Sequence, residues 1–308
     1  MQRRQFIGTL AGGLIAGLVS VPGRARTAET KSAEPGGPGS PGDLARSIKG
    51  RLEAIEARVA GRLGVSIVDT DSGFAAGWRD EERFPMCSTF KALAAAAVLE
   101  HVDKRLDDLS RRIVFTREEL VTYSPVTGKH TGGQGMTLSE LCEAAVTLSD
   151  NTAGNLLLAS IGGPAGLTAF ARRLGDTVTR LDRTEPTLNE ALPGDPRDTT
   201  SPAAMRATLR ALLLDNRLSP RSREQWLAWL QGNRVGDERI RAGLPKGWRV
   251  GDKTGTGERG TTNDVAFVWP PERGPIIVTA YLTATTAAAG ERNAALAEVG
   301  RLAASVVG

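Results

Sequence analysis

The sequence predicts an α+β protein in which strands from both ends of the chain form one antiparallel sheet with flanking helices. β-Rich apolar runs occur early, at 63–69 and 74–78, and again late, in the segments WRVGDKTGT, DVAFVWP and IIVTAYLTA. From residue 88 to about 214 the pattern is mainly helical. Because the helices separate the two groups of strands, we expect them to form a second lobe, with a cleft between the lobes.

The N-terminal segment has the features of an export signal and is kept apart from the fold. Arg3 and Arg4 precede an apolar, glycine-rich stretch at 6–21, which is shorter than the roughly 20 residues of a membrane span. This arrangement is typical of a twin-arginine signal, which we assign to residues 1–28. We therefore expect a periplasmic or secreted protein without stable membrane association after export.

Residues 29–43, which include EPGGPGSPGD, are predicted to be a flexible linker. One domain is then predicted over 44–308, with an α/β lobe at 44–86 and about 232–308 and a helical lobe at about 87–231. Its first helix is predicted from apolar residues at helical spacing: Leu44, Ile48, Leu52, Ile55 and Val59.

Other elements of the domain have clear local signals. The turn DTDSG joins the first two strands, and Thr137 and Glu140 form a capping box at the start of a helix. Pro164 and Pro202 occupy positions that a first helical turn accepts. The segment ERNAALAEVGRLAASVV predicts a closing helix.

Composition argues against several classes of function. The formal net charge is only +4, part of it comes from arginines of the export signal, and aromatic residues make up 5%. A nucleic-acid partner is therefore not expected. The two cysteines, Cys87 and Cys142, and the two histidines, His101 and His130, form no CxxC or CxxH pair, so we expect no metal and no other cofactor.

Four short segments carry side chains suited to catalysis by a serine nucleophile. Ser88 precedes Lys91 by three residues at the start of an alanine-rich helix, so that the amine is within reach of the hydroxyl. The segment SDN at 149–151 ends a predicted helix, and KTG at 253–255 lies in a predicted strand. The segment EPTLN at 185–189 lies in a long irregular stretch, 176–201, of a kind that is usually functional. The order Ser-x-x-Lys, Ser-Asp-Asn, Lys-Thr-Gly is a strong combined signal.

These segments resemble those of the class A serine β-lactamases, and the resemblance runs from about Leu44 to the C-terminus. It implies hydrolysis of the β-lactam ring of penicillins and cephalosporins through an acyl-enzyme on Ser88, with antibiotic resistance as the result. It also implies a monomer that works on small-molecule β-lactams without a cofactor.

The resemblance implies roles for individual residues. Ser149 passes a proton to the departing lactam nitrogen, and Glu185 with Asn189 positions the water that hydrolyses the ester. Either Lys91 or Glu185 takes the proton of Ser88 during acylation, and this choice stays open. The expected catalytic residues are Ser88, Lys91, Ser149, Glu185 and Asn189.

The resemblance also implies a substrate site and a supported loop. The backbone N–H groups of Ser88 and Thr256 form the oxyanion hole. Arg183 and Asp198 close the loop around Glu185, whose bond to Pro186 is cis. The expected substrate-binding residues are Tyr123, Asn151, Lys253, Thr254, Gly255, Thr256 and Arg239. For Tyr123 a place in the hydrophobic core remains the alternative.

The cysteines depart from two family patterns. One subgroup bridges the position of Cys142 to a position that is Ala95 here, and another bridges the position of Cys87 to one that is Gly257 here. Two free thiols are therefore expected. Asp150 is expected to cap and brace a helix end, His101 to lie partly exposed on a helix, and His130 to lie in a loop.

Two other functions share most of these motifs. A D,D-peptidase or transpeptidase acting on D-Ala-D-Ala peptides lacks the loop with Glu185 and stays acylated. A non-catalytic β-lactam sensor binds without turnover. Glu185 is the residue that favours the hydrolase.

Overall fold

A central antiparallel sheet is built from both ends of the domain, and this confirms the predicted α+β class. The structure, a computed structural model, describes residues 40–307. The expected export signal and the expected linker up to residue 39 lie outside the described residues. The five strands lie in the order β2-β1-β9-β8-β7, with the bounds β1 Arg62–Asp69, β2 Ala75–Trp78, β7 Arg249–Thr256, β8 Thr262–Trp269 and β9 Ile276–Thr283.

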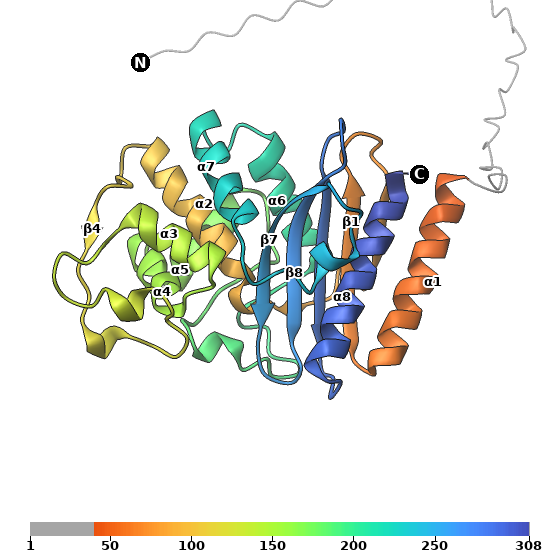
Figure 1. Cartoon of the computed structure of the whole chain (residues 1–308), viewed down its shortest axis with the longest axis horizontal. Coiled ribbons are helices and arrows are strands. Elements are labelled where there is room, and N and C mark those ends of the chain that lie inside the picture. Colours follow the sequence, from red (N-terminus) through yellow and green to blue (C-terminus); the bar gives the residue numbers. More distant parts are fainter. Residues whose placement is uncertain (1–39, 308) are drawn as a thin grey trace, which may run out of the picture. The chain divides into compact units, whose positions relative to one another are not determined.

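Two terminal helices cover one face of this sheet. Figure 1 shows α1 (Pro41–Val59) and α8 (Ala289–Ala304) side by side along the strands. Side chains alternate across the sheet, as the two-residue period of a strand requires. Val278 and Leu282 of β9 join the core beneath α1 and α8, whereas Tyr281 joins the core on the opposite face. The middle strand is therefore buried on both sides.

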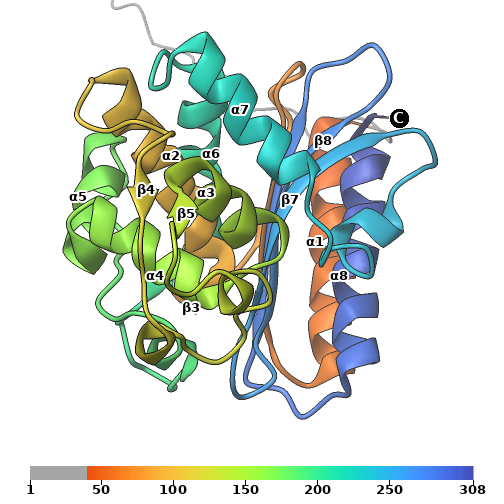
Figure 2. The same ribbon diagram turned by 60° about the vertical axis from the view of Figure 1, so that its left-hand side comes forward.

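The other face carries the helical elements (Figure 2). Their bounds are α2 Phe90–Asp103, α3 Leu138–Thr147, α4 Asn151–Ser160, α5 Gly163–Arg173, α6 Pro202–Leu214 and α7 Pro220–Gln231. The alanine-rich α2 is buried from Phe90 to Glu100, because small side chains let neighbouring helices approach on every side. Trp226 of α7 donates its indole N–H to the carbonyl of Ala92 at 2.9 Å, so α2 is the central helix of this lobe.

Short elements complete the chain. The two-stranded pairs are β3 (Phe84–Pro85) with β6 (Thr199–Thr200) and β4 (Arg112–Ile113) with β5 (Met136–Thr137). The 3-10 turns are η1 Cys87–Thr89, η2 Arg117–Glu119, η3 Thr127–Lys129, η4 Thr187–Asn189, η5 Ile240–Gly243 and η6 Ser305–Val307.

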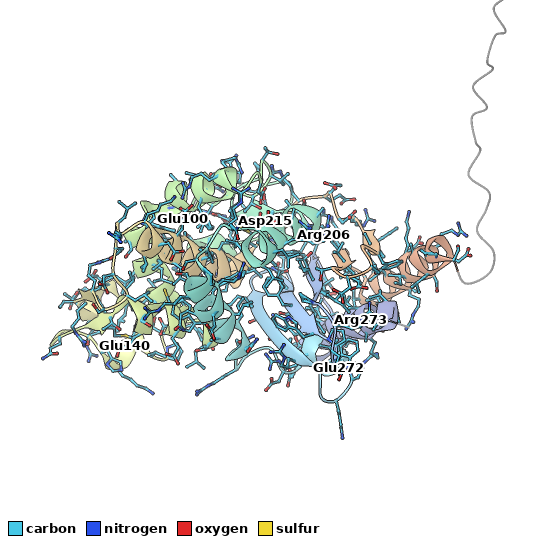
Figure 3. All side chains as sticks on the ribbon, turned by 90° about the horizontal axis from the view of Figure 1, so that it is seen from above. Glu100, Glu140, Arg206, Asp215, Glu272 and Arg273 are labelled. Atoms are coloured by element: carbon cyan, nitrogen blue, oxygen red, sulfur yellow. The ribbon has the colours of Figure 1, made fainter. Side chains whose placement is uncertain are left out.

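Peripheral ion pairs join segments that are distant in sequence. Figure 3 labels Glu100 and Arg273, which lie in different parts of the fold. Glu100 of α2 pairs with Arg173 of α5 at 2.6 Å, and Arg273, between β8 and β9, pairs with Asp69 at the end of β1 at 2.9 Å. Within 40–307, no helix combines the length and the apolar character needed to cross a membrane.

Two element boundaries differ from the prediction. The linker was expected to reach residue 43, but α1 begins at Pro41, because the Ser40 hydroxyl accepts the N–H of Asp43 and proline suits a first helical turn. Ser88 was expected in the first turn of an α-helix, but it lies in η1, since Cys87 before it has a φ of 45° and α2 begins only at Phe90. The division into lobes near residues 86 and 231 stays a prediction.

Candidate active site

The hydroxyl of Ser88 touches both groups that were proposed as its base. Lys91 Nζ donates to Ser88 Oγ at 2.9 Å, and Ser88 Oγ donates to Glu185 Oε1 at 3.0 Å. Lys91 and Glu185 form an ion pair at 2.9 Å, and both side chains are fully buried. An amine and a carboxylate thus share one nucleophilic oxygen, with hydrogen-bond geometry that allows either to take its proton.

Lys91 is held by the segment that follows α3. Its Nζ donates to the carbonyl of Ser149 at 2.8 Å and to Asn151 Oδ1 at 2.6 Å. Burial lowers the pKa of Lys91, while the negative charges of Glu185 and Asp150 act in the opposite direction. Gly154 of α4 leaves the space this lysine needs, because a Cβ there would lie 2.8 Å from Lys91 Cε.

Ser149 lies between two lysine amines. Lys253 Nζ donates to Ser149 Oγ at 3.0 Å and to the carbonyl of Thr254 at 2.8 Å, and Lys91 Nζ is 3.5 Å from the same hydroxyl. Burial and the charge of Lys91 lower the pKa of Lys253 well below its ordinary value. The Ser149 hydroxyl therefore lies between two lysines, each with a lowered pKa, and is placed to exchange protons with either of them.

Asp150 braces the backbone around these groups. It is the N-cap of α4, where it accepts the N–H of Ala153 at 2.9 Å. It also accepts the N–H groups of Val126 and Thr127, each at 2.9 Å. The predicted capping role is confirmed, although the helix it caps is the one that follows rather than the one that precedes it.

The loop that carries Glu185 is fixed at several points; we call residues 176–201 the Glu185 loop. The Glu185–Pro186 bond is cis, and η4 brings the Asn189 amide onto Glu185 Oε2. The side chain of Asn155 of α4 forms two hydrogen bonds of 2.9 Å with the backbone N–H and carbonyl of Glu185. These contacts aim the carboxylate at Ser88.

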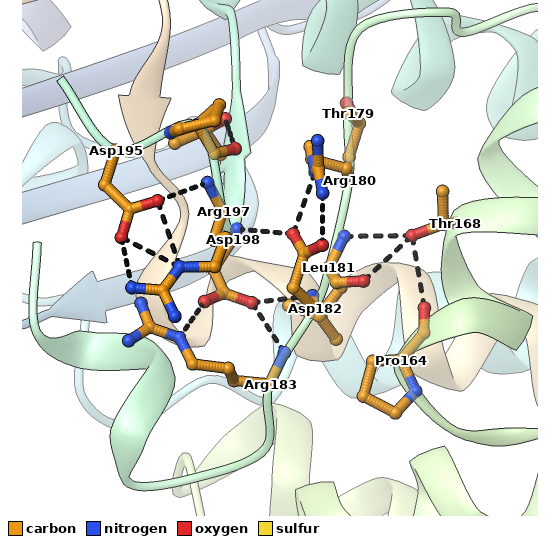
Figure 4. A network of polar contacts seen from close by, with 12 residues as sticks. Pro164, Thr168, Thr179, Arg180, Leu181, Asp182, Arg183, Asp195, Arg197 and Asp198 are labelled. Atoms are coloured by element: carbon orange, nitrogen blue, oxygen red, sulfur yellow. Dashed lines mark hydrogen bonds and ion pairs between the residues drawn. The ribbon is translucent and has the colours of Figure 1, made fainter.

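An ion pair joins two points of the loop, Arg183 and Asp198, on either side of Glu185. Arg183 Nε donates to Asp198 Oδ2 at 2.6 Å, and Asp198 Oδ1 accepts the N–H groups of Asp182 and Arg183 at 2.8 and 2.9 Å. Figure 4 shows Asp198 at the centre of this network. Arg183 also pairs with Glu190 at 2.6 Å. The loop is thereby closed between residues 183 and 198.

A cavity of about 360 Å³ opens onto Ser88. Five of the seven predicted substrate-binding residues line it, namely Tyr123, Asn151, Arg239, Thr254 and Thr256. The other lining residues are Ser88, Ser149, Asn189 and Val235. Lys253 reaches it through Ser149, whereas Gly255 does not line it. Gly255 instead permits close packing, since a Cβ there would lie 2.8 Å from the carbonyl of Met86.

Arg239 and Tyr123 both line this cavity. Arg239 donates to Thr256 Oγ1 at 2.8 Å and to the carbonyls of Gly255 and Asn263 at 2.9 and 2.7 Å. Burial lowers the pKa of Arg239. Tyr123 is 54% exposed, which excludes the alternative that it belongs to the core.

Two residues of the site were missed by the sequence analysis. Val235 lines the cavity and has no motif around it. Asn155 had a usable signal, because it lies one helical turn after Asn151 and therefore on the same face of α4.

The side chains of the two cysteines and the two histidines take no part in these hydrogen bonds. Cys87 and Cys142 are buried free thiols, as predicted, and burial raises the pKa of each. His101 lies partly exposed on α2, and His130 is exposed after η3. Among residues 40–307, no group of three or more His, Cys, Asp or Glu residues is arranged to hold a metal ion.

Comparisons with known proteins agree with this geometry. A family model described as the β-lactamase enzyme family matches residues 47–307. The β-lactamase CTX-M-97 of Escherichia coli is 49% identical over 84% of this chain and 88% of its own length, and CTX-M-8 of Citrobacter amalonaticus is 48% identical over the same shares.

Solved structures extend the comparison to the fold. The reconstructed last common ancestor of class A β-lactamases of Gram-negative bacteria is 61% identical, with a TM-score of 0.84, and covers 85% of this chain and 100% of its own. A putative class A β-lactamase, PenP of Rhodopseudomonas palustris, is 58% identical, with a TM-score of 0.83, over 84% of this chain and 99% of its own. This chain therefore belongs to the family of class A serine β-lactamases.

Proposed function

We propose that the protein opens the β-lactam ring of penicillins and cephalosporins through an ester on Ser88 and so confers resistance to these antibiotics. The observation that carries the proposal is the contact of Ser88 Oγ with both Lys91 Nζ and Glu185 Oε1. A serine hydroxyl needs such a base to become nucleophilic, and an ester needs a placed base to be hydrolysed by water.

In the acylation half, Ser88 Oγ bonds to the lactam carbonyl carbon and gives its proton to Lys91 or Glu185. The N–H groups of Ser88 and Thr256 stabilise the negative carbonyl oxygen. The ring C–N bond then breaks, and the nitrogen receives a proton through Ser149, which Lys91 and Lys253 flank. The product of this half is a seryl ester.

In the deacylation half, water bonds to the ester carbon and gives a proton to Glu185, with Asn189 beside it. The ester C–O bond breaks, and Ser88 recovers a proton. Substrate is held by its carboxylate near Lys253, Thr254, Thr256 and Arg239. Its acyl amide faces Asn151, and Tyr123 forms the wall of the cavity.

The test is to replace Glu185 with alanine. We expect Glu185→Ala to be acylated by benzylpenicillin and to accumulate the ester, seen as a mass adduct, while the steady-state rate falls by about 10² to 10⁴. Glu258→Gln is the matched control, because Glu258 is an exposed acid close to the site whose backbone N–H, not its side chain, donates to the carbonyl of Asn189. Hydrolysis at the parent rate without an adduct would refute the role of Glu185.

Turnover and release assays on the parent protein separate the alternatives. The parent protein is expected to turn over a chromogenic cephalosporin continuously. A D,D-peptidase would give one stoichiometric burst, and a sensor would retain fluorescent penicillin without release. The contact of Glu185 with Ser88 favours continuous turnover.

We also propose that residues 1–28 direct export by the twin-arginine route, and that the mature protein is monomeric in the periplasm or outside the cell. Arg3 and Arg4 before a short apolar stretch support the export route. Periplasmic protein is expected to lack about 28 N-terminal residues by intact mass and to elute as a monomer; full-length protein confined to the cytoplasm would contradict the proposal.

A further inference from the structure

A second cavity beside the Glu185 loop is larger than the one at Ser88. It has a volume of about 520 Å³, against about 360 Å³ for the cavity at Ser88, and the two share no lining residue. Residues 191–196 of the Glu185 loop form one wall. Residues distant from the loop in sequence, among them Arg62, Arg83, Pro85 and Ala284, also line it.

The size and the walls of this cavity suit a small organic ligand. Pockets that bind small molecules have volumes of about 300–1,000 Å³ and are mostly apolar, with a few polar groups that fix orientation. Leu192, Pro193 and Pro196 supply an aliphatic surface from the loop, and Pro85, outside the loop, supplies another.

The charges of the lining are balanced except for one. Arg62 pairs with Glu82 at 2.9 Å and lies over the ring of Phe84 at 4.4 Å. Asp195 pairs with Arg197 at 2.6 Å, which Figure 4 shows. The acid and base groups in these pairs compensate each other.

Arg83 is the exception. Its Nη1 donates to the carbonyl of Val178 at 2.8 Å and to Thr199 Oγ1 at 3.0 Å, both neutral acceptors. Arg83 forms no salt bridge with a carboxylate of residues 40–307. A guanidinium carries five N–H donors in a planar fork that matches a carboxylate, so donors remain for an anionic ligand.

We propose that this cavity is a second ligand site, which binds a small monocarboxylate with an apolar body. The carboxylate contacts Arg83, and the apolar body lies against Leu192 and the prolines of the loop. The charge of Arg83 selects an anion, and the apolar walls select an aryl or alkyl group over a hydrophilic one.

Binding of 4-phenylbutyrate to the full-length mature protein, measured by calorimetry, tests the proposal. We expect its neutral analogue 4-phenylbutanamide to bind about tenfold more weakly or worse, because the ionic hydrogen bond to Arg83 is lost. Hydrogen exchange is expected to slow in a peptide that covers residues 191–199 when the acid is added.

The variants are matched so that the two cavities are distinguished. Arg83→Gln is expected to weaken binding of the acid about tenfold or more. Arg239→Gln changes a residue of the cavity at Ser88 and is expected to leave binding of the acid unchanged. Leu192→Glu places a negative charge, the same sign as that of the ligand, in the lining without removing the hydrogen bonds of Arg83. This variant is expected to abolish binding of the acid. The proposal is overturned if Arg239→Gln loses binding while Arg83→Gln and Leu192→Glu retain it, or if the amide binds as well as the acid.

Discussion

The ion pair between Arg183 and Asp198 offers a quantitative test of how the Glu185 loop is held. Asp198 is 1% exposed and Arg183 is 17% exposed at the side chain, and their atoms lie 2.6 Å apart. Loss of one partner from a fully buried pair costs about 3–5 kcal/mol. Because Arg183 is partly exposed and also contacts Glu190, we expect a smaller coupling of about 2 kcal/mol, or roughly a thirtyfold change in loop opening.

A double-mutant cycle isolates this coupling. Arg183→Met keeps the apolar stem of the arginine, and Asp198→Asn keeps an acceptor for the two backbone N–H groups. Asparagine also tolerates the φ of 57° at this position. The readout is hydrogen exchange of the amides of Leu188 and Asn189, whose acceptors lie within the loop at Thr184 and Pro186.

The control is a second cycle on the same loop. Arg197 and Asp195 pair at 2.6 Å, but Arg197 is 45% exposed, so solvent screens the pair and their coupling is expected to be much smaller than that of Arg183 and Asp198. Equal coupling energies in the two cycles would refute the reasoning, since burial would then make no difference to how the loop is closed.

Two further predictions concern Gly257 and Asp264. A Cβ on Gly257 would lie 2.6 Å from Cys87 Sγ and 2.8 Å from the carbonyl of Asn189. Gly257→Cys is therefore expected to form a disulfide with Cys87 in oxidant, seen by mass as a loss of two hydrogens. Gly257→Ser controls for the crowding of Asn189, and persistence of both free thiols would contradict the expectation. Burial and the charge of Asp252 raise the pKa of Asp264 well above its ordinary value of 3.8, so its protonated form stabilises the fold at low pH and this contribution is lost as pH rises toward the raised pKa. The urea midpoint of Asp264→Asn relative to the parent should therefore rise with pH above about 4, the ordinary pKa of the carboxyl. A difference independent of pH would show that the carboxyl titrates normally.

The parts of the site that depend on local geometry were predictable from the sequence. Ser88 and Lys91 are three residues apart, so any helical turn brings their side chains together, and the 3-10 turn found here does so as well as an α-helix. The strands β7, β8 and β9 follow from apolar runs bounded by glycine and proline. Such features need only the period of the backbone.

The relative positions of segments that are distant in sequence could not be predicted from the sequence alone. Nothing in the sequence alone places β9 between β1 and β8, because strand order depends on how two distant segments pair. The contact between Ser88 and Glu185 spans 97 residues, and it relies on Asn155 and on the closure by Asp198. Asn155 is an ordinary helical asparagine until its partner, the Glu185 backbone, is known.

Both candidate bases for acylation, Lys91 and Glu185, contact the Ser88 hydroxyl. Lys91 and Glu185 contact each other as well as Ser88, so the protonation of one affects that of the other. The two mechanisms differ only in which of the two groups receives the proton of Ser88. Burial lowers the pKa of Lys91, and Glu185 is the largest influence that raises it. Glu185→Gln removes that charge, so the pKa of Lys91 should fall further. The rate of acylation of Glu185→Gln by benzylpenicillin is measured by stopped-flow as a function of pH. If Lys91 is the base, the maximal rate is unchanged, and the rising limb of the pH–rate profile moves to lower pH. If the rate instead falls at every pH, Glu185 takes the proton, and Lys91 serves to hold the pair in place.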